Sequence, residues 1–183
     1  MEIKSRKVVY ECPIFKIEER QVVLPNNIER TFWVMIRPPN VGVVALTNDK
    51  KIVLIKEILG EDSKECLLIP GGKVDTYEYN EEDVKNQVLT ELREEAGYTA
   101  KNVELLTKYS APWNTIDRDY FHYVAWDLED VGQNLEDGES INRFLVTLEE
   151  AEKIIQERRM TSPEEERILE KAIKFFKEKG LLP

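Results

Sequence analysis

Three closely spaced glutamates, Glu91, Glu94 and Glu95, follow the glycine pair Gly71 and Gly72 in this chain. Carboxylates repel one another more strongly once they are partly removed from water, and a bound cation relieves that repulsion. Ligation by carboxylate oxygens, completed by a backbone carbonyl from a glycine turn, suits a hard ion such as Mg²⁺, with Mn²⁺ as an alternative. The residue types therefore predict a site for a divalent metal and a phosphate-bearing ligand.

A helix over about residues 81–96 is predicted to position these glutamates, with Asn80 as its N-cap and Gly97 closing it in a left-handed conformation. At about 100° per residue, Glu91 and Glu95 fall within or beside the apolar face that must pack on the protein. A fully solvated glutamate would lie on the opposite side of the helix. The alternative interpretation is an ordinary charged helix that faces water.

Two other glutamate-rich segments need no ligand to explain them. Ser162 and Glu165 are spaced as a capping box, with Pro163 at the first helical position, and Thr147 and Glu150 repeat the capping-box spacing. Neither segment follows a glycine pair, so the predicted metal site belongs to residues 70–98 alone.

The stretch from Pro70 to Tyr98 resembles the signature of Nudix hydrolases, G-x5-E-x7-R-E-U-x-E-E-x-G-U, in which U is a bulky aliphatic or aromatic residue. The second half of the signature is matched in register by Glu91, Leu92, Glu94, Glu95, Gly97 and Tyr98. Glu82 lies at the expected spacing before Thr90, and Gly72 matches the opening glycine if about four residues are inserted around 77–80.

The order of predicted elements from about Val8 to Ile155 is similar to that of the ADP-ribose pyrophosphatase branch of this family. The resemblance implies Mg²⁺-dependent cleavage of the pyrophosphate bond in a nucleoside diphosphate linked to another moiety, with ADP-ribose or a nucleotide sugar as the first substrate to test. It also implies roles for the residues. Glu91 and Glu95 would be the central metal ligands, and Glu94 would bind a further ion. The carbonyl of Gly71 would reach the metal, Gly72 would lie against the substrate, and either Glu91 or Glu94 could orient the attacking water.

Three departures from the family pattern favour a second hypothesis, a catalytically impaired nucleotide-binding sensor or interaction module. Thr90 replaces the arginine that precedes the first metal-binding glutamate, and Leu59 stands where the branch often has a phosphate-binding arginine, which leaves Lys56 as the nearest cation. In the loop that often carries a glutamate for the attacking water, this chain offers Asp117 or Asp119. These aspartates could equally form a solvated salt bridge with the arginine between them.

Aromatic and basic residues suggest how a nucleoside diphosphate could be recognised. Strand alternation places Trp33 and Arg37 on one face, so that Trp33 could stack on a base and Arg37 could pair with phosphate. Trp33 could equally lie in a dimer interface. Trp113 is a second aromatic candidate on a loop, and it could equally be an anchor that fixes the loop.

The chain is predicted to have an α+β fold, a mixed β-sheet between helices in an α/β/α sandwich. Residues 1–38 are predicted to form an N-terminal β arm or small sheet, and the resemblance implies that residues 39–183 form a Nudix-like catalytic domain. The predicted strands are residues 7–11, 14–24, 29–37, 41–46, 52–55 and 120–128. The predicted helices are residues 81–96, 148–158 and 163–179. By resemblance, the N-terminal arm would build a homodimer.

Composition limits the expected partners. The net charge of −10 and the absence of a Lys/Arg cluster argue against nucleic acid or an anionic membrane as the main partner. The absence of a long apolar span and of a signal peptide, together with two isolated cysteines, Cys12 and Cys66, predicts a cytoplasmic protein. The single histidine, His122, lies in a predicted strand and is expected to be structural.

Overall fold

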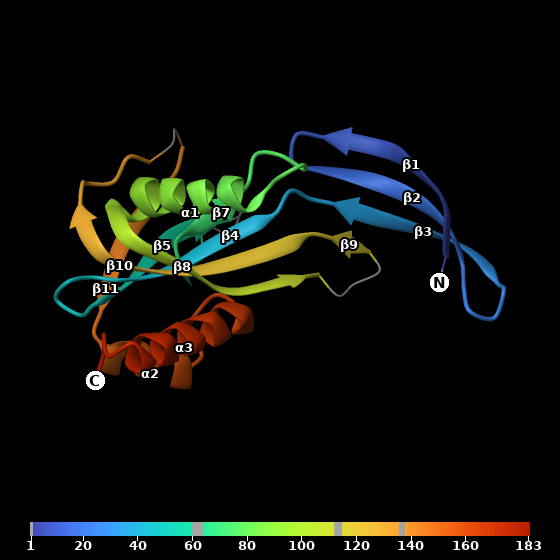
Figure 1. Ribbon diagram of the computed structural model, residues 1–183. Coiled ribbons are helices and arrows are strands. Elements are labelled where there is room, and N and C mark those ends of the chain that lie inside the picture. Colours follow the sequence, from blue (N-terminus) through green and yellow to red (C-terminus); the bar gives the residue numbers. More distant parts are fainter. Residues whose placement is uncertain (1, 60–63, 112–114, 136–137) are drawn as a thin grey trace.

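The computed structural model of the chain describes residues 2–59, 64–111, 115–135 and 138–183. Two β-sheets and three helices make up this described part (Figure 1). The strands are β1 (Glu2–Cys12), β2 (Phe15–Val23), β3 (Glu29–Ile36), β4 (Asn40–Leu46), β5 (Ile52–Leu59), β6 (Lys64–Leu68), β7 (Gly71–Lys73), β8 (Tyr98–Ser110), β9 (Ile116–Asp117), β10 (Asp119–Asp130) and β11 (Ile141–Val146). The helices are α1 (Glu81–Ala96), α2 (Leu148–Gln156) and α3 (Pro163–Glu178).

The larger sheet has the strand order β11-β5-β4-β10-β8, with β6 paired to β5 and β7 paired to β4. It is a mixed sheet, because β4 and β10 run parallel whereas the other pairs are antiparallel. Helix α1 covers one face of the sheet, and α2 and α3 cover the other (Figure 1). The predicted α+β sandwich is therefore confirmed.

Strand β4 is buried on both faces, which explains its continuous apolar sequence. Val41, Val43 and Ala45 belong to the core under α1, whereas Val44 and Leu46 belong to the core under α2 and α3. The alternation of side chains along the strand thus supplies both hydrophobic cores from one run of residues.

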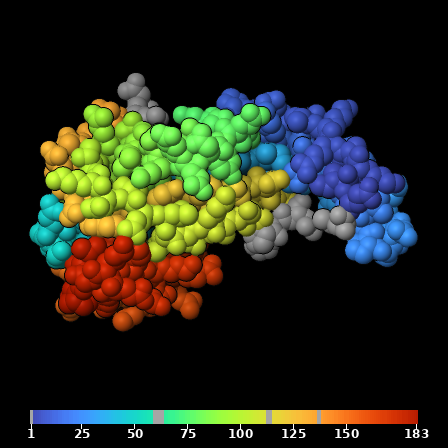
Figure 2. All heavy atoms as spheres, in the orientation of Figure 1, coloured from blue at the N-terminus to red at the C-terminus, as the bar shows by residue number. Residues whose placement is uncertain are grey.

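The smaller sheet has the order β1-β2-β3-β9 and projects to one side of the larger one (Figures 1 and 2). Its fourth strand, β9, comes from a distant part of the sequence and pairs in parallel with Met35 and Ile36 of β3. The predicted small N-terminal sheet is present, with this strand added to it. Val8, Val9 and Tyr10 of β1 are exposed.

Helix α1 begins and ends at the predicted residues because both ends are capped locally. The side chain of Asn80 accepts hydrogen bonds from the amides of Glu82 and Asp83, and the Asp83 carboxylate accepts one from the Asn80 amide. Gly97 closes the helix with φ 73°, a left-handed conformation that glycine adopts readily. Among the described residues, no helix is both long and apolar enough to cross a membrane.

Replacement of Gly97 with alanine should destabilise the protein more than the same replacement at Gly180. Both glycines are left-handed, with φ 73° and 71°, so each variant should lose about 1 kcal/mol from backbone strain. A Cβ at Gly97 would also lie 2.7 Å from backbone atoms of Gly132 and Gln133, whereas nothing lies within 4 Å at Gly180. We therefore expect Gly97→Ala to lower the free energy of unfolding by about 1–3 kcal/mol more than Gly180→Ala, because inserting an extra group into a packed site has a cost of this size. Urea unfolding of both variants measures the difference. Equal losses would contradict the close packing of the α1 end against residues 132–133.

Candidate active site

A polar cavity of about 310 Å³ lies where α1, β7 and β5 meet. Its lining contains every residue predicted to bind metal, namely Gly71, Glu91, Glu94 and Glu95, together with the predicted substrate-binding residue Gly72. The remaining lining residues are Glu57, Lys73, Asp75, Gln87 and Glu139. We call this space the acidic cavity.

Glu95 is the most enclosed carboxylate of the acidic cavity, with 6% of its surface exposed. Its Oε2 accepts a hydrogen bond from the Gly71 amide at 2.7 Å. Burial raises the pKa of Glu95 to about 9, the hydrogen bond from Gly71 opposes this shift, and the charges of Glu91, Glu57 and Glu139 add to it. A buried carboxylate among other carboxylates is therefore the centre of a site that favours positive charge.

The glycine pair allows β7 to approach α1 and β4 closely. A Cβ at Gly72 would lie 2.0 Å from Oε1 of Glu91, and a Cβ at Gly71 would lie 2.3 Å from the carbonyl oxygen of Val41. Glu91 is also held from its own helix, because Nε2 of Gln87 donates to its Oε1 at 2.9 Å. The two glycines thus set the distance between the turn and the glutamates.

Three acidic residues of the cavity, Glu57, Asp75 and Glu139, were missed in the sequence. Glu57 comes from β5, and burial raises its pKa, with the charge of Glu139 adding to the shift. Glu139 comes from the segment between β10 and β11, just before β11 begins at Ile141. A glutamate near the end of a buried strand could have drawn attention to Glu57, but no local pattern marks Glu139.

The acidic cavity fits a hard divalent cation in its donor chemistry, because carboxylate oxygens dominate its lining. The side chains are not already arranged as ligands: within the described ranges, no three His, Cys, Asp or Glu side chains form a group that could hold a metal ion. Glu95 and Glu91 instead accept hydrogen bonds from Gly71 and Gln87. The carboxylates are gathered in one cavity, and a cation would have to compete with these contacts.

Arg37 lies in a different cavity, of about 200 Å³, between the two sheets. Asp117 and Asp119 line this cavity and not the acidic one, so the structure does not bring them to the predicted metal site. Asp117 pairs with Arg20 at 2.7 Å, and Asp119 accepts from Ser110 at 2.5 Å. The salt bridge considered within residues 117–119 is therefore replaced by one to β2.

The other residues predicted to contact substrate are absent from the lining of the acidic cavity or lie outside the described residues. Trp33 lies on β3 with 57% of its surface exposed, and Thr90 is exposed on α1. Lys56 does not line the acidic cavity and pairs with Glu65 at 2.8 Å, because alternation turns it to the face opposite Glu57. Trp113 lies outside the described residues, as does the side chain of Leu59.

The sequence matches the NUDIX domain over residues 36–171, and the chain therefore belongs to the Nudix family. It is 29% identical over 160 residues to a methanol dehydrogenase activator from Bacillus methanolicus, an alignment that covers 86% of this chain and 84% of the relative. It is 26% identical over 156 residues to an ADP-ribose pyrophosphatase from Bacillus subtilis (strain 168), covering 84% of this chain and 82% of the relative.

A solved structure described as an ADP compounds hydrolase has the same fold, with a TM-score of 0.80 over 99% of this chain and 96% of that chain. Its sequence is 21% identical, so the likeness concerns the fold. Proteins of the Nudix family generally depend on divalent metals and act on nucleotide derivatives. The acidic cavity lies at the segment that carries the Nudix signature.

Alanine replacements at the two glycines should separate stability from metal binding. In Gly71→Ala the new Cβ meets backbone, which cannot move easily, so we expect a loss of about 1–3 kcal/mol in the free energy of unfolding. In Gly72→Ala the three nearest atoms all belong to the carboxyl end of the Glu91 side chain, which can move, so stability should change by less than about 1 kcal/mol while Glu91 is displaced. Urea unfolding and Mn²⁺ titration of both variants measure these effects. Undiminished Mn²⁺ affinity in Gly72→Ala would argue against Glu91 as a ligand.

Proposed function

We propose that this protein is a divalent-metal-dependent hydrolase that cleaves the pyrophosphate bond of a nucleoside diphosphate linked to another moiety. The observation that carries the proposal is the enclosure of Glu91, Glu94 and Glu95 in one cavity with the glycine turn. ADP-ribose or a nucleotide sugar is the first substrate to test. Two relatives support this choice by their names, an ADP-ribose pyrophosphatase and an ADP compounds hydrolase.

In the proposed site, Glu91, Glu95 and the carbonyl of Gly71 would hold a Mg²⁺ or Mn²⁺ ion, and Glu94 would bind a further one. Such an ion, when bound, neutralises phosphate charge and lowers the pKa of a coordinated water. The chain carries a net charge of −10, so a diphosphate would otherwise be repelled. The amide of Gly71 keeps Glu95 oriented toward the turn, which restricts the positions a carboxylate ligand can take.

The attacking water requires a carboxylate that is not fully engaged with metal. Glu57 and Glu139 enter the acidic cavity from outside α1, and we propose them as candidates for this role in addition to Glu91 and Glu94. Asp117 and Asp119 are less suited to this role, because both line a separate cavity between the sheets. A residue that orients the attacking water must lie within reach of the bound substrate, so a carboxylate that lines the acidic cavity is the better candidate.

For substrate recognition, we propose that Arg37 pairs with a phosphate from the cavity between the sheets. Its Nε is buried and donates no hydrogen bond to the described protein atoms, and the cavity also contains Arg6 and Arg20. The exposed Trp33 would stack on the base or lie in a dimer interface. We further propose that residues 1–38 form a dimerising arm, a role supported by the exposed apolar side chains of β1.

A second candidate function is a Nudix domain that binds a nucleotide without efficient hydrolysis and acts on a partner protein. Thr90 favours this candidate, because it removes the charge-assisted contacts that an arginine would give to the carboxylate cluster. A relative named as an activator of another enzyme, methanol dehydrogenase, gives the candidate further support.

The decisive experiment incubates the protein and Mg²⁺ with a panel of dinucleotides and nucleotide sugars, followed by separation of the products. We expect a nucleoside monophosphate and a phosphorylated second product. Glu95→Gln should lower kcat by at least about 100-fold, because an amide cannot ionise to give the carboxylate ligand that a bound cation requires. Glu81→Gln, an exposed change on the first turn of α1, is the matched control and should keep wild-type rates. Equal rates in Glu95→Gln and Glu81→Gln would remove Glu95 from the mechanism.

Restoring arginine at Thr90 separates the two candidate functions. If catalysis is weakened by the missing arginine, Thr90→Arg should raise kcat by about tenfold, the effect of one charge-assisted hydrogen bond. Steady-state kinetics with ADP-ribose measures kcat, and calorimetry measures the affinity for the nucleotide. Tight metal-dependent nucleotide binding with no turnover in either protein would favour the sensor.

A further inference from the structure

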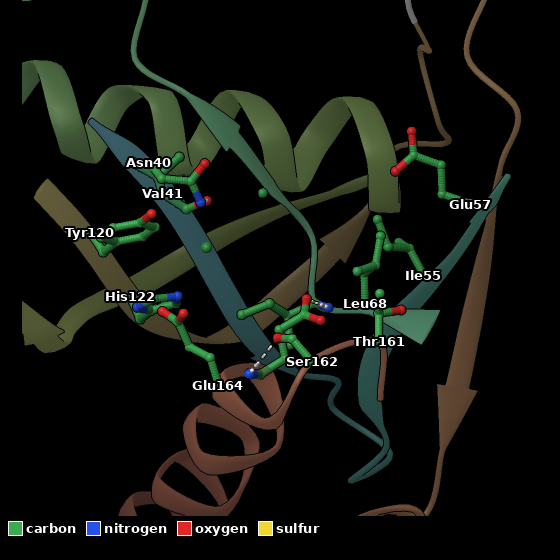
Figure 3. A pocket seen from close by; sticks show the side chains of 14 residues that line it. Asn40, Val41, Ile55, Glu57, Leu68, Tyr120, His122, Thr161, Ser162 and Glu164 are labelled. Carbon is green, nitrogen blue, oxygen red and sulfur yellow. Dashed lines mark hydrogen bonds between the residues drawn. The ribbon is translucent and has the colours of Figure 1, made fainter. Parts of the chain in front are cut away.

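A second cavity, of about 320 Å³, lies on the other side of β7, between the larger sheet and the beginning of α3 (Figure 3). We call it the α3 pocket. It shares Glu57 and Gly71 with the acidic cavity, so the two spaces meet at the glycine turn. Its volume lies within the range of about 300–1,000 Å³ that is usual for small-molecule sites.

Three polar atoms of the α3 pocket are buried and have no hydrogen-bond partner among the described residues: Nδ1 of His122, Oε1 of Glu164 and Oε2 of Glu165. His122 has only 5% of its surface exposed. In Figure 3 the side chains of His122 and Glu164 point toward one another, from the sheet and from α3. Because buried polar atoms in native proteins are almost always partnered, this group indicates a place where a ligand supplies the partners.

Helix capping accounts for only part of the contacts of these glutamates. Ser162 does cap α3, since its hydroxyl accepts from the Glu165 amide at 3.2 Å. The carboxylate of Glu165, however, also reaches the sheet connection, where Oε1 accepts from the Ile69 amide at 3.2 Å. Oε2 of Glu165 and Oε1 of Glu164 have no hydrogen-bond partner among the described residues, and both glutamates line the pocket.

The chemistry of the lining favours a neutral ligand rich in hydrogen-bond donors. Burial raises the pKa of Glu165 to about 7 and also raises that of Glu164, while burial and the charge of Lys171 lower the pKa of His122 to about 4. His122 is therefore neutral near pH 7 and offers one donor and one acceptor. A phosphate would meet the carboxylates of Glu57, Glu164 and Glu165, which repel it.

An aromatic stack borders the same space. The rings of Tyr120 and Tyr109 are stacked with centroids 5.0 Å apart, and Tyr109 stacks on His122 at 5.9 Å. Tyr120 lines the α3 pocket together with Asn40 (Figure 3). The pocket thus places aromatic side chains beside carboxylate acceptors, a lining that suits a sugar, whose hydroxyls donate hydrogen bonds to the carboxylates.

We propose that the α3 pocket binds the hydroxyl-bearing sugar attached to the diphosphate, while the phosphate next to that sugar lies in the acidic cavity. This inference rests on the proposed hydrolase function, whose substrate it orients. The vicinal hydroxyls of a sugar match the neighbouring carboxylates of Glu164 and Glu165, and His122 completes the set of partners. The nucleoside end of the substrate then lies away from α3.

The single histidine of the chain permits a direct test, because the imidazole signals in an NMR spectrum can come only from His122. Metal-free protein is titrated with ribose 5-phosphate, methyl phosphate and AMP. We expect ribose 5-phosphate to shift the His122 signals with a Kd at least tenfold lower than the other two compounds. Equal or tighter binding of methyl phosphate would reveal a phosphate site, and equal or tighter binding of AMP a nucleoside site. Either result, or the absence of any shift, overturns the proposal.

Two alanine variants on α3 give a matched comparison. Glu164→Ala removes one proposed acceptor and should raise the Kd for ribose 5-phosphate about tenfold, whereas Glu170→Ala, on an exposed position of the same helix, should leave it unchanged. The unliganded His122 signals and circular dichroism report whether each variant is folded. Equal Kd values in the two variants overturn the assignment.

The failure of this inference can be distinguished from the failure of the proposed function. If no member of the nucleotide panel is hydrolysed but ribose 5-phosphate still shifts His122, the hydrolase proposal fails and the sugar pocket stands. If ADP-ribose is hydrolysed with the same KM in wild type and Glu164→Ala, the pocket assignment fails and the hydrolase stands.

Discussion

The hydrogen bond from the Gly71 amide to the carboxylate of Glu95 is the contact on which the site depends. It ties the short strand β7 to the last turn of α1 at 2.7 Å, inside a region from which water is largely excluded. The approach is possible only because Gly71 and Gly72 have no side chains, since a Cβ at Gly72 would meet the carboxylate of Glu91. The spacing between turn and helix glutamates therefore follows from one hydrogen bond and two missing side chains.

The parts of the fold that were predictable from sequence are those determined by neighbouring residues. Helix α1 has its expected ends because Asn80 and Gly97 lie directly beside them, and the inward direction of Glu95 follows from helical periodicity. Glu57 and Glu139 could not be assigned in this way. Their presence in the cavity depends on how β5 and the segment before β11 lie relative to α1, which is a property of the assembled sheet.

Contacts between residues far apart in sequence also explain why the surroundings of other candidate residues were predicted incorrectly. Asp117 was considered as the residue that orients the attacking water, from its order along the chain, but β9 pairs with β3 and places Asp117 in the smaller sheet. At Ser162 the local pattern correctly identified the cap of α3. It could not reveal that the carboxylate of Glu165 reaches Ile69 and leaves an oxygen at a pocket, because that contact joins residues far apart in sequence.

Strand β7 is three residues long and pairs only with β4 among the described strands, so cavities can form on both sides of it. On the side of α1, buried carboxylates repel one another and favour a cation, which in turn attracts phosphate. On the side of α3, burial keeps His122 neutral and shifts Glu165 toward its protonated form, which favours uncharged hydrogen-bonding groups. Since Glu57 and Gly71 line both spaces, a ligand with a charged middle and a neutral end could occupy both at once. The polarity of the two cavities would then fix its direction across the turn.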